Sequence, residues 1–457
     1  MKKSLTKSFI LVLLIVASIY QIITLWFDDV SDRNFFYSFL DRVNEIISEP
    51  KGEFDKEYMT SPRMLGVFIG ISDKDFTIIE KKNIDYDKIL GESMTVFNKV
   101  LSNGQFEGVY DDASALWQSR GLIFSLSLIM SKEALASDFN VNVSTFGELS
   151  SVQTMGIIPA KEKADKIKVY FIDEQTNQVY IYGLDEKELK ERNNNINSYI
   201  NTTESKTYPP YYSSLKNVDE LFKGNILLPL PTSNIRYNNK IKLTTPFVIN
   251  ENFGTEDLEI FVNGFFDNPN VKWTIQNSSD MKYGDDHALV KYNNKAIFEY
   301  SSIISNNKVS LGLSEAFNVA EEFIVKDVLL VKGDYQLSSY EKQGEKTIFY
   351  YEYEFDGLPL LMDKQLLVSN NMKYPIEITI ESGKVVKYKR LLFYMNGVDR
   401  EEAFSSEFVE ALNSFVDKND IRKEQLDDMY LGYVMNDNNV KLMWIIKYNG
   451  KVYSLEL

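Results

Sequence analysis

The sequence predicts an α+β protein: a single N-terminal transmembrane helix, a mixed α/β domain, and tandem modules in which one helix packs on an antiparallel sheet. An uncharged apolar run covers residues 9–27, and a mixed pattern of strands and helices follows it. From residue 255 on, the pattern of an amphipathic helix followed by several strands occurs three times. Strands that alternate apolar and polar residues are typical of antiparallel sheets with one solvated face. A helix on the other face completes an α+β architecture.

The apolar run Phe9–Phe27 has 19 residues and no charge. A helix of this length crosses a hydrocarbon core of ~30 Å. The lysines before it are Lys2, Lys3 and Lys7, and acidic Asp28 follows it. The positive-inside rule therefore places the N-terminus in the cytoplasm and the bulk of the chain outside, as a single-pass cell-membrane protein. A cleaved signal peptide is the alternative, but its apolar core has ~7–15 residues and ends at a small-x-small site.

We divide the chain by these changes of pattern. The predicted parts are a cytoplasmic tail (1–7), a transmembrane helix (8–27), a juxtamembrane helix (28–49), an N-terminal mixed α/β domain (50–245), a central helix-on-sheet domain (246–396) and a C-terminal module (397–457). The juxtamembrane helix has apolar residues at helical spacing, Ser31 as its N-cap, and Pro50 at its end. We expect it to continue close to the anchor.

The N-terminal domain contains strand and helix patterns in alternation. We predict strands at 67–71, 168–173 and 179–184, helices at 94–101, 113–130 and 186–199, and a loop at 202–214. A turn at Asn177 connects the last two strands. Residues 122–130 are apolar but too few to span a membrane, so they form a buried helix or a buried strand.

The three later units each begin with a helix, predicted at 255–266, 314–325 and 402–416. The strands predicted after these helices are 271–276, 288–293 and 296–301 in unit one, 335–341, 346–355, 358–370, 375–380 and 385–395 in unit two, and 429–435, 441–449 and 451–457 in unit three. Asn293-Asn294, Ser382-Gly383 and Asn449-Gly450 are good hairpin-turn sequences.

Composition limits the classes of function. Of 457 residues, 44% are hydrophobic and 13% aromatic, which is too apolar for a disordered chain. The net charge is −16, and with the three anchor lysines inside, 47 basic and 66 acidic residues leave the exterior at −19. This charge argues against nucleic acid and against docking on an anionic membrane surface. An exterior protein without cysteine suggests a bacterial envelope.

The chemical inventory is small, and we expect no enzyme activity, cofactor or metal. The chain has one histidine, His287, in a polar turn, and it has no P-loop and no GxGxxG sequence. The acidic doublets that could act as general acid and base are Asp111-Asp112, Asp285-Asp286 and Glu256-Asp257. Neighbours on a strand point to opposite faces, and turns collect aspartate for local reasons, so these doublets are weak catalytic candidates.

The anchor carries the sharpest candidate site. Ile10 and four further residues lie on one helical face, and we predict that these four bind a partner: Leu14, Ala17, Gln21 and Thr24. Small and polar residues on one stripe associate membrane helices, at ~0.6–2 kcal/mol for each polar contact. The alternative is that Gln21 and Thr24 lie shallow enough to be solvated. Self-association, giving a homo-oligomer, is equally open.

Several segments resemble the YycH-type accessory proteins of the WalK–WalR (YycG–YycF) two-component system. FFDNPNVKWTIQ (265–276) and MKYGDDHALVKYNNKAIFEYSS (281–302) are similar to that family's sheet, and YYEYEFDGLPLLMDKQLLV (350–368) looks like the sheet shared with its sister YycI. MWIIKYNGKVYSLEL (443–457) resembles the last hairpin of PepSY-like domains. The layout agrees along the whole chain, and the residues agree mainly over 255–457. The family's Tyr-x-Asp-Gly turn is Tyr283-Gly284-Asp285-Asp286 here.

The resemblance implies a non-enzymatic regulator in a Gram-positive envelope. Its partners would be a WalK/YycG-like sensor histidine kinase and a YycI-like sister protein, in signal transduction that controls cell-wall metabolism. Two other classes of function are kept. One is an extracytoplasmic binding module, or a PepSY-type module that holds a peptidase in check. The other is a cell-wall hydrolase that uses paired carboxylates.

Overall fold

The computed structural model describes residues 59–455 except for short segments. The segments left out are 61, 69–75, 80, 82, 84, 112, 114–118, 162–164, 206–209, 215–220, 223–224, 230–235, 239, 250–255, 304–308, 331–333, 399–401, 404–407, 422–425 and 437–438. Within the described part, no helix combines the length and apolar character that crossing a membrane requires. The predicted transmembrane helix, juxtamembrane helix and partner-binding anchor face lie outside the described residues.

The first sheet has nine strands in the order β3-β7-β6-β5-β4-β1-β2-β8-β9. Every neighbouring pair in it is antiparallel. Its strands are β1 (Pro62–Phe68), β2 (Phe76–Ile79), β3 (Gln105–Tyr110), β4 (Gly121–Ser131), β5 (Ser151–Ile158), β6 (Lys166–Asp173), β7 (Val179–Asp185), β8 (Pro210–Ser213) and β9 (Leu227–Pro229).

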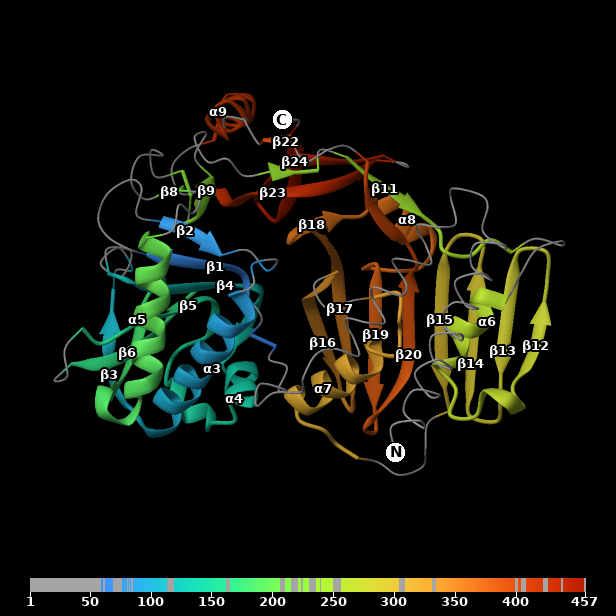
Figure 1. Cartoon of the computed structure of the whole chain (residues 1–457), viewed down its shortest axis with the longest axis horizontal. Helices are drawn as coiled ribbons and strands as arrows, with labels where there is room; N and C mark the ends of the chain where they lie inside the picture. The colour runs from blue at the N-terminus through green and yellow to red at the C-terminus, as the bar shows by residue number, and fades with distance from the viewer. Residues whose placement is uncertain are drawn as a thin grey trace, which may run out of the picture. The chain divides into compact units, whose positions relative to one another are not determined.

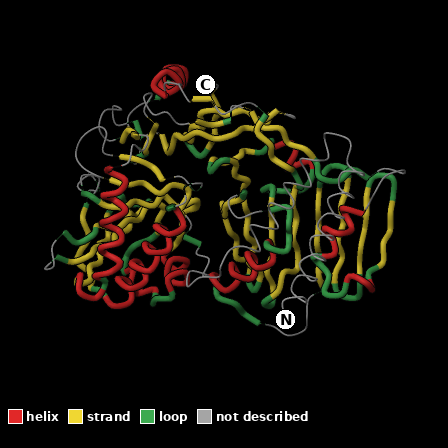
Figure 2. The backbone as a smooth tube through the Cα atoms, viewed as in Figure 1, coloured by secondary structure: helices red, strands yellow, loops and turns green. Residues whose placement is uncertain are grey.

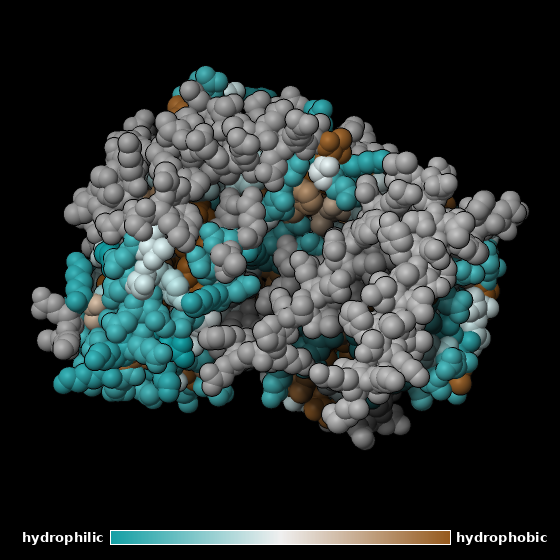
Figure 3. Space-filling model, in the orientation of Figure 1, coloured by the Kyte–Doolittle hydropathy of each residue, from teal (hydrophilic) through white to brown (hydrophobic). Residues whose placement is uncertain are grey.

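Three helices cover one face of the first sheet: α3 (Tyr86–Asn103), α4 (Lys132–Phe139) and α5 (Lys190–Ser205). Figure 1 shows α3 beside α5, and Figure 2 shows helices gathered on this sheet. Phe97 of α3 packs on Phe124, Phe139 and Phe171, so it joins two helices to the sheet. The outward surface of this helical layer is mainly hydrophilic (Figure 3).

The second sheet has fourteen described strands, in the order β12-β13-β14-β15-β20-β19-β17-β18-β23-β24-β11-β21, with β16 on β17 and β25 on β24. Its strands are β11 (Lys240–Thr244), β12 (Trp273–Gln276), β13 (Asp280–Gly284), β14 (Ala288–Asn293), β15 (Ile297–Ser302), β16 (Tyr335–Gln343), β17 (Lys346–Phe355), β18 (Leu358–Leu361), β19 (Ile376–Glu381), β20 (Lys384–Leu391), β21 (Tyr394–Gly397), β23 (Leu426–Asn436), β24 (Asn439–Tyr448) and β25 (Lys451–Leu455). A separate pair joins β10 (Arg236–Tyr237) to β22 (Glu402–Ala403).

The three predicted helix-on-sheet units share this one sheet. Unit one joins unit two through the antiparallel pair β15–β20, and unit two joins unit three through the parallel pair β18–β23. The helices are α6 (Glu256–Asn263), α7 (Leu313–Ile324), α8 (Lys364–Ser369) and α9 (Phe408–Asn419). Aromatic side chains hold helices to strands: Phe261 of α6 packs on Phe298, Phe317 of α7 on Phe349, and Phe408 of α9 on Trp444. The expected packing of a helix on each unit is therefore present.

Several predicted elements are confirmed. The strands β6 and β7 match the predicted 168–173 and 179–184, and Asn177 between them has a φ of 56°. Ser382 and Gly383 have φ values of 51° and 76°, and Asn449 and Gly450 have 50° and 68°. These left-handed pairs match the two-residue hairpin turns that the sequence predicts.

The helix predicted at 113–130 is wrong, because residues 121–131 form β4. The first four residues of this strand are all buried, so its start lacks the period of two that distinguishes a strand from a buried helix. The alternative of a buried strand at residues 122–130 is confirmed. The loop predicted at 202–214 is also wrong, because α5 continues to Ser205 and β8 follows at Pro210–Ser213.

The strand predicted at 358–370 divides into β18 and α8. Asp363 causes the change, since its side chain accepts the N–H of Gln365 and caps the helix. The helix predicted from Glu402 begins at Phe408, and Glu402–Ala403 forms β22. The strand predicted at 385–395 is interrupted at residues 392–393, between β20 and β21. The strand β11 belongs to the second sheet.

Candidate ligand-binding cleft

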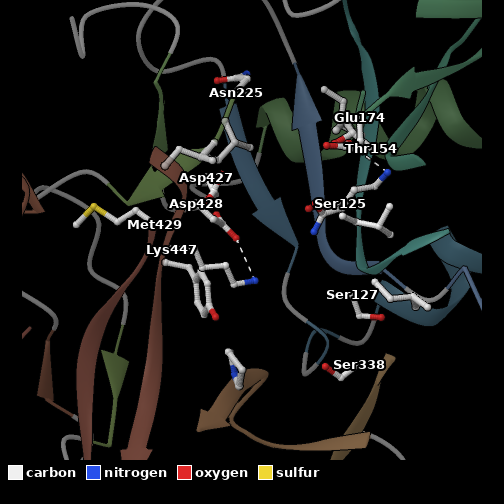
Figure 4. A pocket seen from close by; sticks show the side chains of 18 of the residues that line it. Ser125, Ser127, Thr154, Glu174, Asn225, Ser338, Asp427, Asp428, Met429 and Lys447 are labelled. Atoms are coloured by element: carbon white, nitrogen blue, oxygen red, sulfur yellow. Dashed lines mark hydrogen bonds and ion pairs between the residues drawn. The ribbon is translucent and has the colours of Figure 1, made fainter. Parts of the chain in front are cut away.

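A cleft of ≈ 1290 Å³ lies between the first sheet and parts of the second sheet. One wall comes from β2, β4, β5 and the end of β6, and the other from β23, β24 and β25. Residues of β9, β16 and the turn between β17 and β18 complete the lining. Figure 4 shows Ser125, Thr154 and Glu174 on one wall, with Asp428 and Lys447 opposite them.

Three contacts hold the elements around the cleft. Lys81 Nζ, just after β2, lies 2.6 Å from Glu354 Oε2 on β17. The hydroxyl of Tyr340 on β16 hydrogen-bonds Ser131 at the end of β4. Leu426 N at the start of β23 donates to Leu221 O over 3.0 Å. These contacts connect the two sheets while leaving the space between them open.

The walls of the cleft contain breaks in strand register. Four residues of β4, Leu126–Ile129, stand opposite one residue of β5, Gln153. Gln153 is itself an extra residue against β6, Ser338 is an extra residue of β16 against β17, and Asp427 is an extra residue of β23 against β24. Each of these sites contributes lining residues to the cleft.

Two buried polar atoms on the lining have no hydrogen-bond partner in the described part of the chain. They are Ser127 Oγ and Asn225 Nδ2. The other amide atom of Asn225, Oδ1, accepts from Ser213 Oγ over 2.7 Å. Buried polar atoms are normally hydrogen-bonded, so both atoms are suited to a water or a ligand group in the cleft.

The pKa values of two carboxyl groups at the cleft, Asp173 and Glu174, are shifted in opposite directions. Burial raises the pKa of Glu174, and the nearby charges of Asp173 and Asp428 add to this effect. A hydrogen bond donated by Gln153 N acts in the opposite direction but does not outweigh it. Burial acts to raise the pKa of Asp173, but hydrogen bonds from Ser150, Gln175 and Thr176 outweigh it and lower the pKa. Asp428 lies 3.9 Å from Lys447. Glu174 and Asp428 are therefore like charges that face each other across the cleft.

The acidic doublets and the histidine predicted from sequence lie elsewhere. His287 is exposed, and Asp285 Oδ1 accepts its N–H over 2.7 Å, as expected for a turn. Asp111 is exposed and accepts from Gln178 over 3.0 Å. Glu256 and Asp257 are exposed on the first turn of α6. In the described residues, no group of three or more His, Cys, Asp or Glu side chains is arranged to hold a metal.

The predicted partner-binding residues Leu14, Ala17, Gln21 and Thr24 lie outside the described residues, so that prediction stays as it was. Sequence reasoning missed the cleft. One signal was present: Ser125 and Ser127 alternate with leucine inside the apolar strand β4, which indicates one polar face. No local signal indicated that these serines and β23 line the same cleft.

Comparison with solved structures gives a match that covers most of the chain. No protein-family model matches the chain, and no curated protein matches it. The crystal structure of YycH from Bacillus subtilis aligns with 89% of this chain and 98% of its own, with a TM-score of 0.50 and 14% identity. The C-terminal domain of YpeB from Bacillus megaterium aligns with 45% of this chain and 99% of its own, at a TM-score of 0.28 and 11% identity, a level too low for argument. The chain therefore has a YycH-like fold.

Proposed function

We propose that this chain is a non-enzymatic, membrane-anchored regulator that modulates a WalK-like sensor histidine kinase from outside the cytoplasmic membrane. One observation carries the proposal: the YycH-like fold, which extends over 98% of YycH. The segments over residues 255–457 that resemble the YycH family support it. The acidic doublets support a non-enzymatic role, because Asp285 accepts hydrogen bonds within its own turn and the exposed Asp111 accepts one from Gln178.

The proposed mechanism joins two contacts. The anchor face of Ala17, Gln21 and Thr24 packs against the membrane helices of the kinase and of a YycI-like sister. The extracytoplasmic domains form a complex with the same partners. Such a complex changes kinase output only if it binds the two signalling states with different affinity. A polar anchor contact worth ~0.6–2 kcal/mol is large enough to shift such an equilibrium several-fold.

The test is site-specific photo-crosslinking from position 21 in native membranes, with mass spectrometry of the adduct. A histidine kinase or a YycI-like protein in the adduct would support the proposal. Position 19 is the matched control, because Ile19 lies on the opposite side of an ideal helix from the Gln21 stripe. Adducts to lipid alone, or equal adducts from both positions, would contradict the anchor-face mechanism.

A substitution pair gives the energetic counterpart. Gln21→Leu removes the polar group, and we expect it to weaken co-purification of the kinase while the extracytoplasmic fold is unchanged. Ile19→Leu changes the other face and should have no effect. Unchanged kinase association in Gln21→Leu would remove this residue from the mechanism.

A further inference from the structure

We propose that the cleft between the two sheets binds an extended polypeptide segment that carries a lysine or arginine side chain. This proposal does not rest on kinase regulation, because it concerns a surface remote in sequence from the anchor. It follows from four features of the cleft: its strand irregularities, its free strand edges, its size and its charge.

The irregularities of the strands gather in the cleft. Among the described strand pairs there are seven register shifts, and four of them supply cleft-lining residues. The lining residues at these sites include Ser127, Gln153, Ser338 and Asp427. A bulge removes its extra residue from the ladder and redirects the side chain, and bulges are enriched beside functional sites. Four bulges from four strands on one lining indicate a built site.

Bulges also leave backbone groups outside the ladder, where another chain can reach them.

Two edge strands adjoin the same space. Among the described strands, β16 pairs with β17 alone and β25 pairs with β24 alone. Ser338–Tyr340 of β16 and Lys451 and Val452 of β25 line the cleft. An edge strand binds extended peptides through main-chain hydrogen bonds, which suit a polypeptide better than a sugar or a small molecule.

The volume favours a polymer over a small ligand. A cleft of ≈ 1290 Å³ exceeds the ~300–1,000 Å³ of typical small-molecule pockets. Apolar side chains on the cleft lining would contact every second side chain of a bound extended peptide. Ile129 on β4 is 56% exposed and Val452 on β25 is 41% exposed, and both line the cleft.

The charge selects a cation. Of the described lining residues, five are acidic and three are basic: Asp173, Glu174, Asp356, Asp427 and Asp428 against Lys81, Lys447 and Lys451. Lys81 is already held by buried Glu354. A basic side chain between Glu174 and Asp428 would be attracted by both carboxylates and would offset their mutual repulsion. An anionic polymer would add to the repulsion.

The experiment uses the full chain in nanodiscs and a display library of random peptides of about ten residues, which span about 33 Å when extended. The most enriched peptide is then titrated by fluorescence anisotropy. We expect enrichment of lysine or arginine within apolar sequence and saturable binding. The double substitution Glu174→Gln/Asp428→Asn should weaken binding by about tenfold or more, as loss of hydrogen bonds between charged groups does.

The matched control removes two charges outside the cleft. Glu256 and Asp286 are exposed and do not line it, so Glu256→Gln/Asp286→Asn should leave binding within about twofold of the parent. Equal weakening by both double variants would show a general effect of net charge and overturn the proposal. Ile129→Arg, at a half-exposed site, adds a cation to the wall and should also weaken binding.

Two further outcomes would overturn the proposal. One is the absence of enriched peptides. The other is competition of the enriched peptide by a neutral chitin oligosaccharide, which would assign the cleft to glycan. A photoreactive residue within the peptide should form adducts with β4, β5, β16, β23 or β25, and adducts confined to other elements would equally contradict the assignment.

Discussion

Lys81 and Glu354, 273 positions apart in sequence, form an ion pair of 2.6 Å that joins the two sheets beside the cleft. Glu354 is 1% exposed and Lys81 is 16% exposed. A buried carboxylate loses its hydration, so its charged form is stable only when a counter-ion and hydrogen bonds compensate for that loss. This pair is therefore a specific link between the first sheet and unit two of the second sheet.

Removing the cation alone should be costly. Lys81→Met leaves the Glu354 carboxylate buried without this counter-ion, and we expect a loss of about 3–5 kcal/mol in the free energy of unfolding. Lys81→Met/Glu354→Gln should lose less, because neither partner is then charged. The measurement is urea unfolding followed by tryptophan fluorescence, arranged as a double-mutant cycle. A coupling energy of about zero would contradict the assigned link.

A second buried pair lies within the central unit. Asp327, just after α7, receives hydrogen bonds from Arg390 Nη1 and from Tyr388 OH, the latter over 3.0 Å. Arg390 is 1% exposed and Asp327 is fully buried. Burial acts to lower the pKa of Arg390, but the Asp327 charge outweighs it and raises the pKa. The guanidinium thus stays charged in the core and ties α7 to β20.

Substitutions at this pair and at an exposed pair should show that the buried ion pair contributes more to the free energy of unfolding. Arg390→Gln should cost about 3–5 kcal/mol of unfolding free energy, because Asp327 is left buried without its counter-ion. Lys373→Gln is the control, since Lys373 pairs with Glu341 at 2.6 Å but is 63% exposed. Exposed pairs contribute about 0–1 kcal/mol. Similar losses in the two variants, measured by denaturant unfolding, would contradict this difference.

The lowered pKa of Asp173 predicts that the stability of the folded protein depends on pH. Ser150 Oγ donates to Asp173 Oδ2 over 2.8 Å, and Gln175 N donates to Asp173 Oδ1 over 2.8 Å. These bonds favour the charged form, so the folded pKa lies below the usual value of 3.8. Stability from this residue is complete above the unfolded-state pKa and is lost as the pH falls through the folded pKa.

The test compares the parent with Asp173→Asn over a pH series from neutral to about 3. At neutral pH the variant should be less stable, because it lacks the charged acceptor. The difference in unfolding free energy should shrink as the pH falls below the usual value of 3.8. A difference that stays constant across the series would show that Asp173 acts through shape and not through charge.

The sequence could predict elements whose signals are local. The turns at Ser382-Gly383 and Asn449-Gly450 and the helix-on-sheet units follow from turn chemistry and hydrophobic period. The fusion of the units into one sheet could not be predicted, because pairs such as Leu360 with Tyr433 join distant residues. For residues 122–130 the sequence left a buried helix and a buried strand open, because the first residues of β4 are all buried and show no period-two alternation.

The cleft escaped prediction for a related reason. A bulge at Gln153 or Asp427 exists only relative to a partner strand, and the partner is set by tertiary pairing. Single residues such as Glu174 show no signal of their own, since the pKa of Glu174 is raised mainly by burial, which only the tertiary fold creates. The anchor residues, in contrast, could be proposed from sequence because membrane insertion is governed by composition within one segment.

Asp138 gives a last prediction, about the start of the described chain. This buried residue of α4 accepts hydrogen bonds from Met59 N (3.0 Å), Thr60 N (2.9 Å) and Thr60 Oγ1 (2.7 Å). Its neighbour Ser137 Oγ accepts the N–H of Ser314, in the first turn of α7, over 3.2 Å. The segment that follows the predicted juxtamembrane helix is thus tied, through α4, to the central unit.

Asp138→Asn should loosen this tie, because an amide NH₂ replaces one of the two oxygens that face three donors. We expect amide hydrogen exchange at Met59 and Thr60 to rise about tenfold, as loss of about 1.4 kcal/mol of local stability predicts. Glu133→Gln, at the exposed start of the same helix, should leave exchange there unchanged. Unchanged exchange in Asp138→Asn would mean that Met59 and Thr60 are held by other contacts and that α4 does not tie this segment to α7.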